Sequence, residues 1–212
     1  MSQRKPIFMT SDWHVFHKNI IQFSNRPFTD VDHMHRVLIN NFNASVPPNG
    51  VCYFLGDMGL CSTGNLKWVM DQLNGTKILI AGNHDGGVNT MYNCGFDAVL
   101  HGAVLEIANQ RVTLSHYPLR GIPREKLDGI PTPDGTNWHG ENRPVAQKFA
   151  FKYDGQFALS GHIHSPNNGR SLTRLGRQMD VGVDGNNYRP VSISTIESWI
   201  AEVLKTENLT PS

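Results

Sequence analysis

The residue types best suited to metal or acid–base chemistry follow apolar runs at five places in the chain. Aspartate offers carboxylate oxygens, asparagine a carbonyl oxygen and histidine an imidazole nitrogen. One such residue at a strand end is usually a turn former or a satisfied polar group. Five such groups, each at the end of a strand, would rarely occur together by chance, and they indicate a shared site. The groups are Asp12 with His14, Asp57, Asn83 with His84 and Asp85, His116, and His162 with His164.

The spacing within two of these groups supports a shared site. Residues i and i+2 of an extended chain point to the same side, so Asp12-x-His14 and His162-x-His164 can each face one ion. Two neighbouring cations repel, and an aspartate with two carboxylate oxygens can bridge them. Nitrogen and oxygen donors together suit manganese, iron, zinc, cobalt or nickel better than calcium. The pattern therefore predicts a two-metal site of the kind that activates water in hydrolases, with ions about 3.5–4 Å apart.

The first half of the sequence has elements that can position these residues. Short apolar runs predict buried strands over 7–10, 51–55 and 77–81. Helices are expected over 31–46, behind an Asp30 N-cap, and over 66–73. This alternation predicts a largely parallel sheet. Ligand crevices of such sheets lie at the C-terminal strand ends, where the polar groups fall.

The second half is richer in short strands. They are expected over 98–100, 104–107, 111–115 and 157–160, with an Asn109-Gln110 turn and a hairpin made from 171–175 and 178–183. A capping-box pattern from Ser194 to Glu197 predicts a final helix to about residue 205, followed by a frayed tail. The segment over about 121–152 is long for a plain connection, which suggests a functional or disordered loop.

The composition narrows the classes of partner and compartment. A 212-residue chain with 39% hydrophobic and 17% charged residues suits a globular protein with a substantial core. A formal net charge of +1 gives no bulk electrostatic case for nucleic acid or membrane partners. No apolar run reaches membrane length. Three cysteines without paired spacing favour reduced thiols, and therefore a cytoplasmic protein.

The ordered polar blocks resemble the calcineurin-like metallophosphoesterase superfamily. They are Asp12-x-His14, Gly56-Asp57, Gly82-Asn83-His84-Asp85, His116 and Gly161-His162-x-His164. The runs 11–28, 180–184 and 189–192 resemble a small bacterial and phage-type subgroup of that superfamily. The resemblance implies one domain over 1–212, built as a two-sheet β-sandwich flanked by helices in a four-layer α–β–β–α arrangement. This α/β class agrees with the alternating first half and the strand-rich second half.

The resemblance also implies a role for each polar residue. Seven would be metal ligands, namely Asp12, His14 and His164 for the first ion, Asn83, His116 and His162 for the second, and Asp57 between them. His84 would stay free of metal and meet the phosphate or protonate the leaving group. Asp85 would orient His84.

One position departs from the pattern of a branch of the family, and other residues outside the blocks are further candidates for the site. Gly56-Asp57 runs into Met58 rather than into the Asp-Arg-Gly run of protein Ser/Thr phosphatases, which disfavours phosphoprotein substrates. His17, Arg26 and Arg120 are candidate substrate-binding residues, with a helix-start polar residue and solvated loop arginines as the alternatives. His33 and His35 are expected to face solvent.

The implied activity is hydrolysis of a phosphate ester of a small molecule or nucleotide. A hydroxide between two divalent ions, with manganese favoured, would attack phosphorus in line while His84 assists the leaving group. A phosphodiesterase is preferred, with a phosphomonoesterase as the alternative. A non-catalytic binding or scaffold protein of the same fold is the rival from another class. It is disfavoured because no expected ligand is missing.

Overall fold

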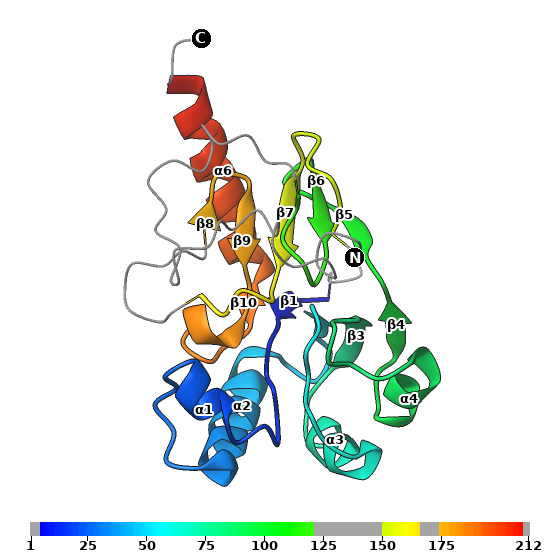
Figure 1. Cartoon of the computed structure of the whole chain (residues 1–212). Coiled ribbons are helices and arrows are strands. Elements are labelled where there is room, and N and C mark those ends of the chain that lie inside the picture. The colour runs from blue at the N-terminus through cyan, green and yellow to red at the C-terminus, as the bar shows by residue number, and fades with distance from the viewer. Residues whose placement is uncertain (1–4, 121–149, 166–173, 210–212) are drawn as a thin grey trace.

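Two five-stranded sheets form the framework of the described part of the chain (Figure 1). The computed structural model describes residues 5–120, 150–165 and 174–209. In the first sheet the strand order is β10-β1-β2-β3-β4, in which β1 to β4 are parallel and the edge strand β10 is antiparallel to β1. Its strands are β1 (Ile7–Thr10), β2 (Val51–Phe54), β3 (Thr76–Ile80), β4 (Ala98–Leu100) and β10 (Val191–Ser192).

The second sheet mixes parallel and antiparallel neighbours. Its order is β5-β6-β7-β9-β8, with β6, β7 and β9 parallel to one another. Antiparallel strands, β5 and β8, form the two edges. The strands are β5 (Ala103–Ile107), β6 (Gln110–Leu114), β7 (Phe157–Ser160), β8 (Arg174–Leu175) and β9 (Gln178–Asp180). Both sheets therefore contain parallel strands whose C-terminal ends can supply one site.

Helices flank this framework, so the predicted class of two sheets flanked by helices is confirmed (Figure 1). They are α1 (Ile20–Phe23), α2 (Val31–Ser45), α3 (Thr63–Met70), α4 (Val88–Asn93), the 3₁₀ turn η2 (Val183–Gly185) and α6 (Ile193–Leu209). Among the described helices, none has both the length and the apolar character needed to cross a membrane.

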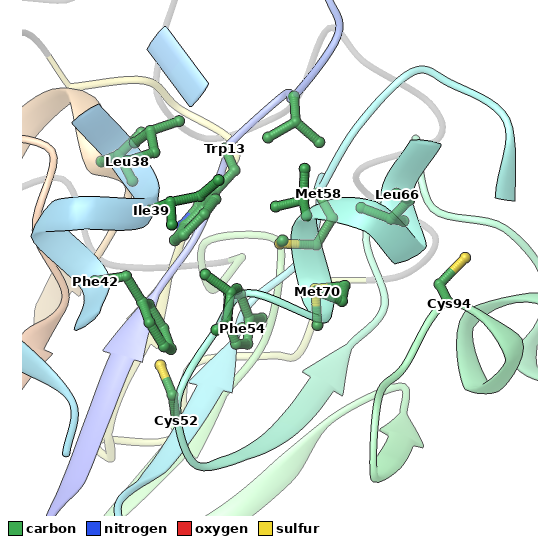
Figure 2. Close-up of a cluster of buried hydrophobic side chains, with 14 of the residues drawn as sticks. Trp13, Leu38, Ile39, Phe42, Cys52, Phe54, Met58, Leu66, Met70 and Cys94 are labelled. Atoms are coloured by element: carbon green, nitrogen blue, oxygen red, sulfur yellow. The ribbon is translucent and has the colours of Figure 1, made fainter. Parts of the chain in front are cut away.

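One hydrophobic core lies between the first sheet and the helices α2 and α3 (Figure 2). Trp13, Phe42 and Phe54 meet there, with ring centroids 5.5–5.7 Å apart. The Trp13 indole nitrogen also donates a hydrogen bond of 2.9 Å to the Thr10 hydroxyl. Because Trp13 is only 1% exposed, its packing anchors the backbone between Asp12 and His14.

A second core is shared by the two sheets and α6. Met9 from the first sheet and Leu114 and Phe157 from the second belong to it, together with Trp199 of α6. The Phe157 and Trp199 rings meet edge to face, with centroids 5.3 Å apart. This core holds the C-terminal ends of β1, β6 and β7 in a fixed relation to one another.

Several element boundaries differ from those expected. The helix expected over 66–73 is α3 at 63–70, since the Ser62 hydroxyl accepts from the Asn65 amide and caps an earlier start. The final helix begins at Ile193 because Ser192, rather than Ser194, accepts from the Thr195 amide. Residues 206–209 continue this helix, so the frayed-tail prediction is wrong for them.

Other local predictions have mixed outcomes. Asp30 caps α2 as expected, its carboxylate accepting from the His33 amide at 2.7 Å. The β5–β6 turn is centred on Ala108 and Asn109, both at positive φ, one residue earlier than expected. Helices α1 and α4 and strand β10 are elements that the apolar pattern did not indicate. Most of the long loop, residues 121–149, and residues 171–173 of the expected hairpin lie outside the described residues.

Candidate metal centre

Polar side chains from both sheets converge at the C-terminal ends of their parallel strands. They form two groups that could each hold a metal ion, and within each group the ligand atoms lie within 4.8 Å of one another. The first group is Asp12, His14 and His164, and the second is Asp57, His116 and His162. These residues follow β1, β2, β6 and β7. The folding of two sheets thus joins residues 12 and 164 in one site.

Left-handed backbone turns aim these side chains. The φ angles of Asp12 and His14 are 58° and 49°, and those of His162 and His164 are 72° and 48°. The expected reason for their shared direction, alternation along an extended chain, is therefore wrong. Non-glycine residues rarely adopt this conformation, and it concentrates at functional sites where the surrounding structure enforces it.

Two glycines allow the turns to approach one another closely. A Cβ at Gly161 would collide with the Ser11 hydroxyl and with Asp12 Oδ2. A Cβ at Gly82 would collide with Asp57 Oδ1. Each glycine precedes a predicted ligand in the sequence, so the Gly-His and Gly-Asn pairs are signals of packing as well as of chemistry.

Asp57, a member of the second group, also approaches the first. Its Oδ2 is 3.6 Å from His14 Nε2 and 3.5 Å from His116 Nε2. Its Oδ1 instead accepts a hydrogen bond of 2.9 Å from the His84 amide. A single carboxylate oxygen therefore faces histidines of both groups.

The first group contains a buried oxygen that fits a cation. Asp12 Oδ1 has no hydrogen-bond partner, while Oδ2 accepts from the His162 amide at 2.9 Å. His164 Nε2 lies 3.8 Å from that Oδ1 and 3.2 Å from His14 Nε2. An unpartnered buried carboxylate oxygen is costly. A positive ion among these three side chains would satisfy it.

The electrostatics of the first group also favour a bound positive charge. Burial lowers the pKa of His14 to about 2, so that its imidazole stays neutral and able to bind metal. Burial raises the pKa of Asp12 to about 6. Burial alone would lower the pKa of His164, but the Asp12 carboxylate and the Asp184 hydrogen bond outweigh it and raise the value to about 9. The acidic residues thus draw positive charge to this group, where a cation would compete with the proton.

The second group has one histidine held by the backbone. His116 Nδ1 donates a hydrogen bond of 2.7 Å to the Leu55 carbonyl, which leaves the Nε2 lone pair facing inward. This Nε2 lies 3.2 Å from His162 Nδ1 and 3.0 Å from Asn83 Oδ1. The structure therefore brings Asn83 beside the second group, at its exposed side.

His84 lies beside both groups without belonging to either. Its side chain is 42% exposed, and its Nε2 is 4.0 Å from Asp57 Oδ2. Its ring centroid is 5.5 Å from that of His14. This position leaves the imidazole accessible to a ligand that approaches the two groups from solvent.

The contacts of Asp85 differ from those expected. Its carboxylate accepts hydrogen bonds of 2.8–2.9 Å from the amides of Gly82, Asp57 and Met58. Asp85 therefore fixes the loop that carries Asp57, whereas the family resemblance implied that it supports the His84 ring.

The three candidate substrate-binding residues have separate positions. His17 is half-buried, with its ring centroid 5.9 Å from that of His14, so it borders the first group. Arg120 has an exposed side chain and backbone hydrogen bonds to Phe151 and Tyr153. Arg26 is buried, and its guanidinium binds Asp184 and two main-chain carbonyls. Both expectations for Arg26, phosphate binding and a solvated loop position, are therefore wrong.

Sequence reasoning missed several supporting residues. Asp184 accepts a hydrogen bond of 2.8 Å from His164 Nδ1, although its only sequence signal was its place in the run 180–184. Asp180 accepts from the amides of Ser165 and Gly182. His35, expected in solvent, is 2% exposed and accepts a hydrogen bond of 2.9 Å from the Phe16 amide. Its position on the apolar face of α2 could have indicated burial.

Comparison with known proteins identifies relatives along the whole length of the chain. No family model matches it. The uncharacterized protein MJ1445 of Methanocaldococcus jannaschii is 44% identical over 214 residues, covering 98% of this chain and 99% of that protein. The crystal structure of the protein of unknown function AQ665 from Aquifex aeolicus matches with a TM-score of 0.65 and 24% identity, covering 92% of this chain and 99% of that one.

A third likeness is weaker. The structure of an archaeal phosphodiesterase matches with a TM-score of 0.40 and 16% identity, covering 84% of this chain and 82% of that one. The AQ665 match supports the fold. The identity and coverage shared with MJ1445 place the chain in the same protein family as that archaeal protein.

Proposed function

We propose that the chain is a phosphoesterase that uses two divalent metal ions, one at each group. The observation that carries the proposal is Asp57 Oδ2, which lies within 3.6 Å of a histidine nitrogen in both groups. The unpartnered Asp12 Oδ1 and the inward Nε2 of His116 add further donors suited to a cation. Imidazole, carboxylate and amide donors together suit manganese, with iron, zinc, nickel or cobalt as alternatives.

Bound ions would supply Lewis-acid stabilisation of a phosphate and a nucleophilic water at neutral pH. The residues of the chain would hold the ions, orient the substrate and protonate its leaving oxygen. Asp57 would hold its carboxylate between the groups because its amide and that of Met58 are fixed by Asp85. His84, exposed and 4.0 Å from Asp57 Oδ2, would donate a proton to the leaving oxygen.

The proposed substrates are small phosphate esters or nucleotides, with diesters preferred. A single exposed histidine beside a two-metal site suits the protonation of an alkoxide leaving group. The near-neutral formal charge of +1 does not favour long nucleic acids, which bind chiefly through basic surfaces. His17, at the border of the first group, is the proposed contact to the phosphate.

Hydrolysis of chromogenic substrates tests this function. Metal-free protein should be inactive, and added Mn²⁺ should give turnover of bis(p-nitrophenyl) phosphate with a higher kcat/KM than for p-nitrophenyl phosphate. A panel of nucleotides and cyclic nucleotides, each with Mn²⁺, Fe²⁺, Zn²⁺, Ni²⁺, Co²⁺ and Mg²⁺, extends the measurement. Faster monoester turnover would reverse the substrate preference. No turnover with any ion would favour a binding or scaffold protein.

A further inference from the structure

The guanidinium of Arg26 forms its hydrogen bonds inside the protein. Its side chain is fully buried, and Nε and Nη2 donate hydrogen bonds of 2.7 and 2.9 Å to the two oxygens of Asp184. Nη2 also donates to the Asp12 carbonyl at 2.7 Å, and Nη1 donates to the Trp13 carbonyl at 2.8 Å. One residue therefore joins Asp184 to the backbone that carries Asp12.

Asp184 in turn contacts His164 of the first group. Its Oδ2 accepts a hydrogen bond of 2.8 Å from His164 Nδ1, so the nitrogen left to face the group is Nε2. That Nε2 lies 3.2 Å from His14 Nε2 and 3.8 Å from Asp12 Oδ1. Arg26 and Asp184 thus contact two of the three members of the first group, Asp12 through its backbone and His164 through its ring.

The second group has a different support. His116 Nδ1 donates to the neutral Leu55 carbonyl, and the Asp57 loop is held by Asp85. Among the hydrogen bonds of the described residues, those of Arg26 and Asp184 include bonds to each other, to His164 and to the backbone at Asp12 and Trp13, and none goes to Asp57 or His116. The His164 ring of the first group and the His116 ring of the second are therefore held by different parts of the fold.

Resting on the proposed two-metal function, we propose that Arg26 and Asp184 are a positioning pair that sets the metal affinity of the first group alone. The bidentate contact fixes the Asp184 carboxylate, which in turn fixes the tautomer and direction of the His164 ring. The carbonyl contacts fix the turn that carries Asp12. The pair thereby couples the orientation of Asp12, which follows a strand of the first sheet, to that of His164, which follows a strand of the second.

A purely structural ion pair is the competing explanation. Buried ion pairs are often no better for stability than well-packed apolar residues, and removing one partner destabilises the fold. Stability alone therefore does not separate the two explanations. Metal affinity at each group does, because a structural role would affect both groups together or neither.

The test measures Mn²⁺ binding to metal-free protein by competition with a chelating dye, for variants that circular dichroism shows to be folded. Wild type should bind two ions. Asp184→Asn should weaken one of them by about 10–100-fold, the usual effect of losing a partner of a ligand histidine, and leave the other unchanged. Arg26→Lys should weaken the same ion, because an ammonium cannot replace the two-pronged contact.

Three further variants make the result specific. His164→Ala should lose the ion that Asp184→Asn weakens, and His116→Ala should lose the other. Ile200→Ala truncates a fully buried side chain of the second core and should lower the melting temperature with both affinities unchanged. Two ions in wild type with unchanged affinities in Asp184→Asn and Arg26→Lys would overturn the inference. Equal weakening of both ions would also overturn it, whereas no metal binding by wild type would overturn the proposed function.

Discussion

Asp57→Asn is expected to lower kcat for phosphodiester hydrolysis by about 10³-fold and to weaken metal binding at both groups. The carboxylate Oδ2 lies 3.5–3.6 Å from histidine nitrogens of both groups, where it can offset the repulsion between two cations. A neutral amide of the same shape removes this charge. Loss of one positioned electrostatic group commonly costs 10²–10³-fold in kcat, and here two ions depend on it.

The measurement combines steady-state hydrolysis with metal analysis of the same samples. Asp71→Asn is the matched control, because Asp71 is an exposed aspartate paired with Lys67 on the helical surface. It should keep wild-type rate and metal content. Two tightly bound ions in Asp57→Asn, or loss of metal from one group alone, would show that Asp57 is not shared between the groups.

His84→Ala is expected to lower kcat by about 10²–10⁴-fold with no loss of metal. A positioned general acid contributes about this much, and His84 lies outside both groups with an exposed imidazole. Asn83→Ala should have the opposite signature, weakening the ion of the second group, because Asn83 Oδ1 is 3.0 Å from His116 Nε2. The two neighbouring residues therefore separate metal binding from proton transfer.

Metal content and rate are measured for both variants under identical loading. His101→Ala provides the control, since His101 is an exposed histidine that belongs to neither group. The proton-donor role also predicts that the rate lost in His84→Ala is smaller for substrates with p-nitrophenolate leaving groups than for alkyl esters. Equal metal loss in His84→Ala and Asn83→Ala would contradict the division between these residues.

Much of the fold could be predicted because its signals are local. The apolar runs at β1, β2 and β3 are short and bounded by polar residues, and their parallel pairing follows from the intervening helices. Elements with little periodicity were not predicted. Helix α1 has four residues and β10 has two, and each depends on packing against distant segments.

The site was predicted as a set of residues, but the geometry that unites them was not. Asp12 and His14 were expected to share a direction through strand alternation, whereas left-handed turns direct both. Such turns depend on contacts between strands far apart in sequence. The Asp12 amide, for example, donates to the Gly56 carbonyl at 3.1 Å. The sequence shows which residues can be ligands, and the tertiary contacts determine the direction in which their side chains point.

The supporting residues were the hardest to predict. Arg26 and Asp184 are 158 positions apart in sequence, and either alone resembles a surface residue. The family resemblance implied that Asp85 orients His84, but its carboxylate accepts hydrogen bonds from the amides of Met58 and Gly82. Such roles depend on which backbone amides at a turn lack a hydrogen-bond partner. No local sequence pattern indicates which amides these are.

Titration of Mn²⁺ into metal-free protein, with phosphodiester hydrolysis measured at each addition, tests the central claim most directly. The protein concentration is kept well above the dissociation constants, so that each equivalent binds. Two ions acting together predict little activity at one equivalent, a steep rise towards the second and a plateau at two ions per chain. Full activity in the metal-free protein, or a plateau at one equivalent, would contradict a site built on the two groups that share Asp57.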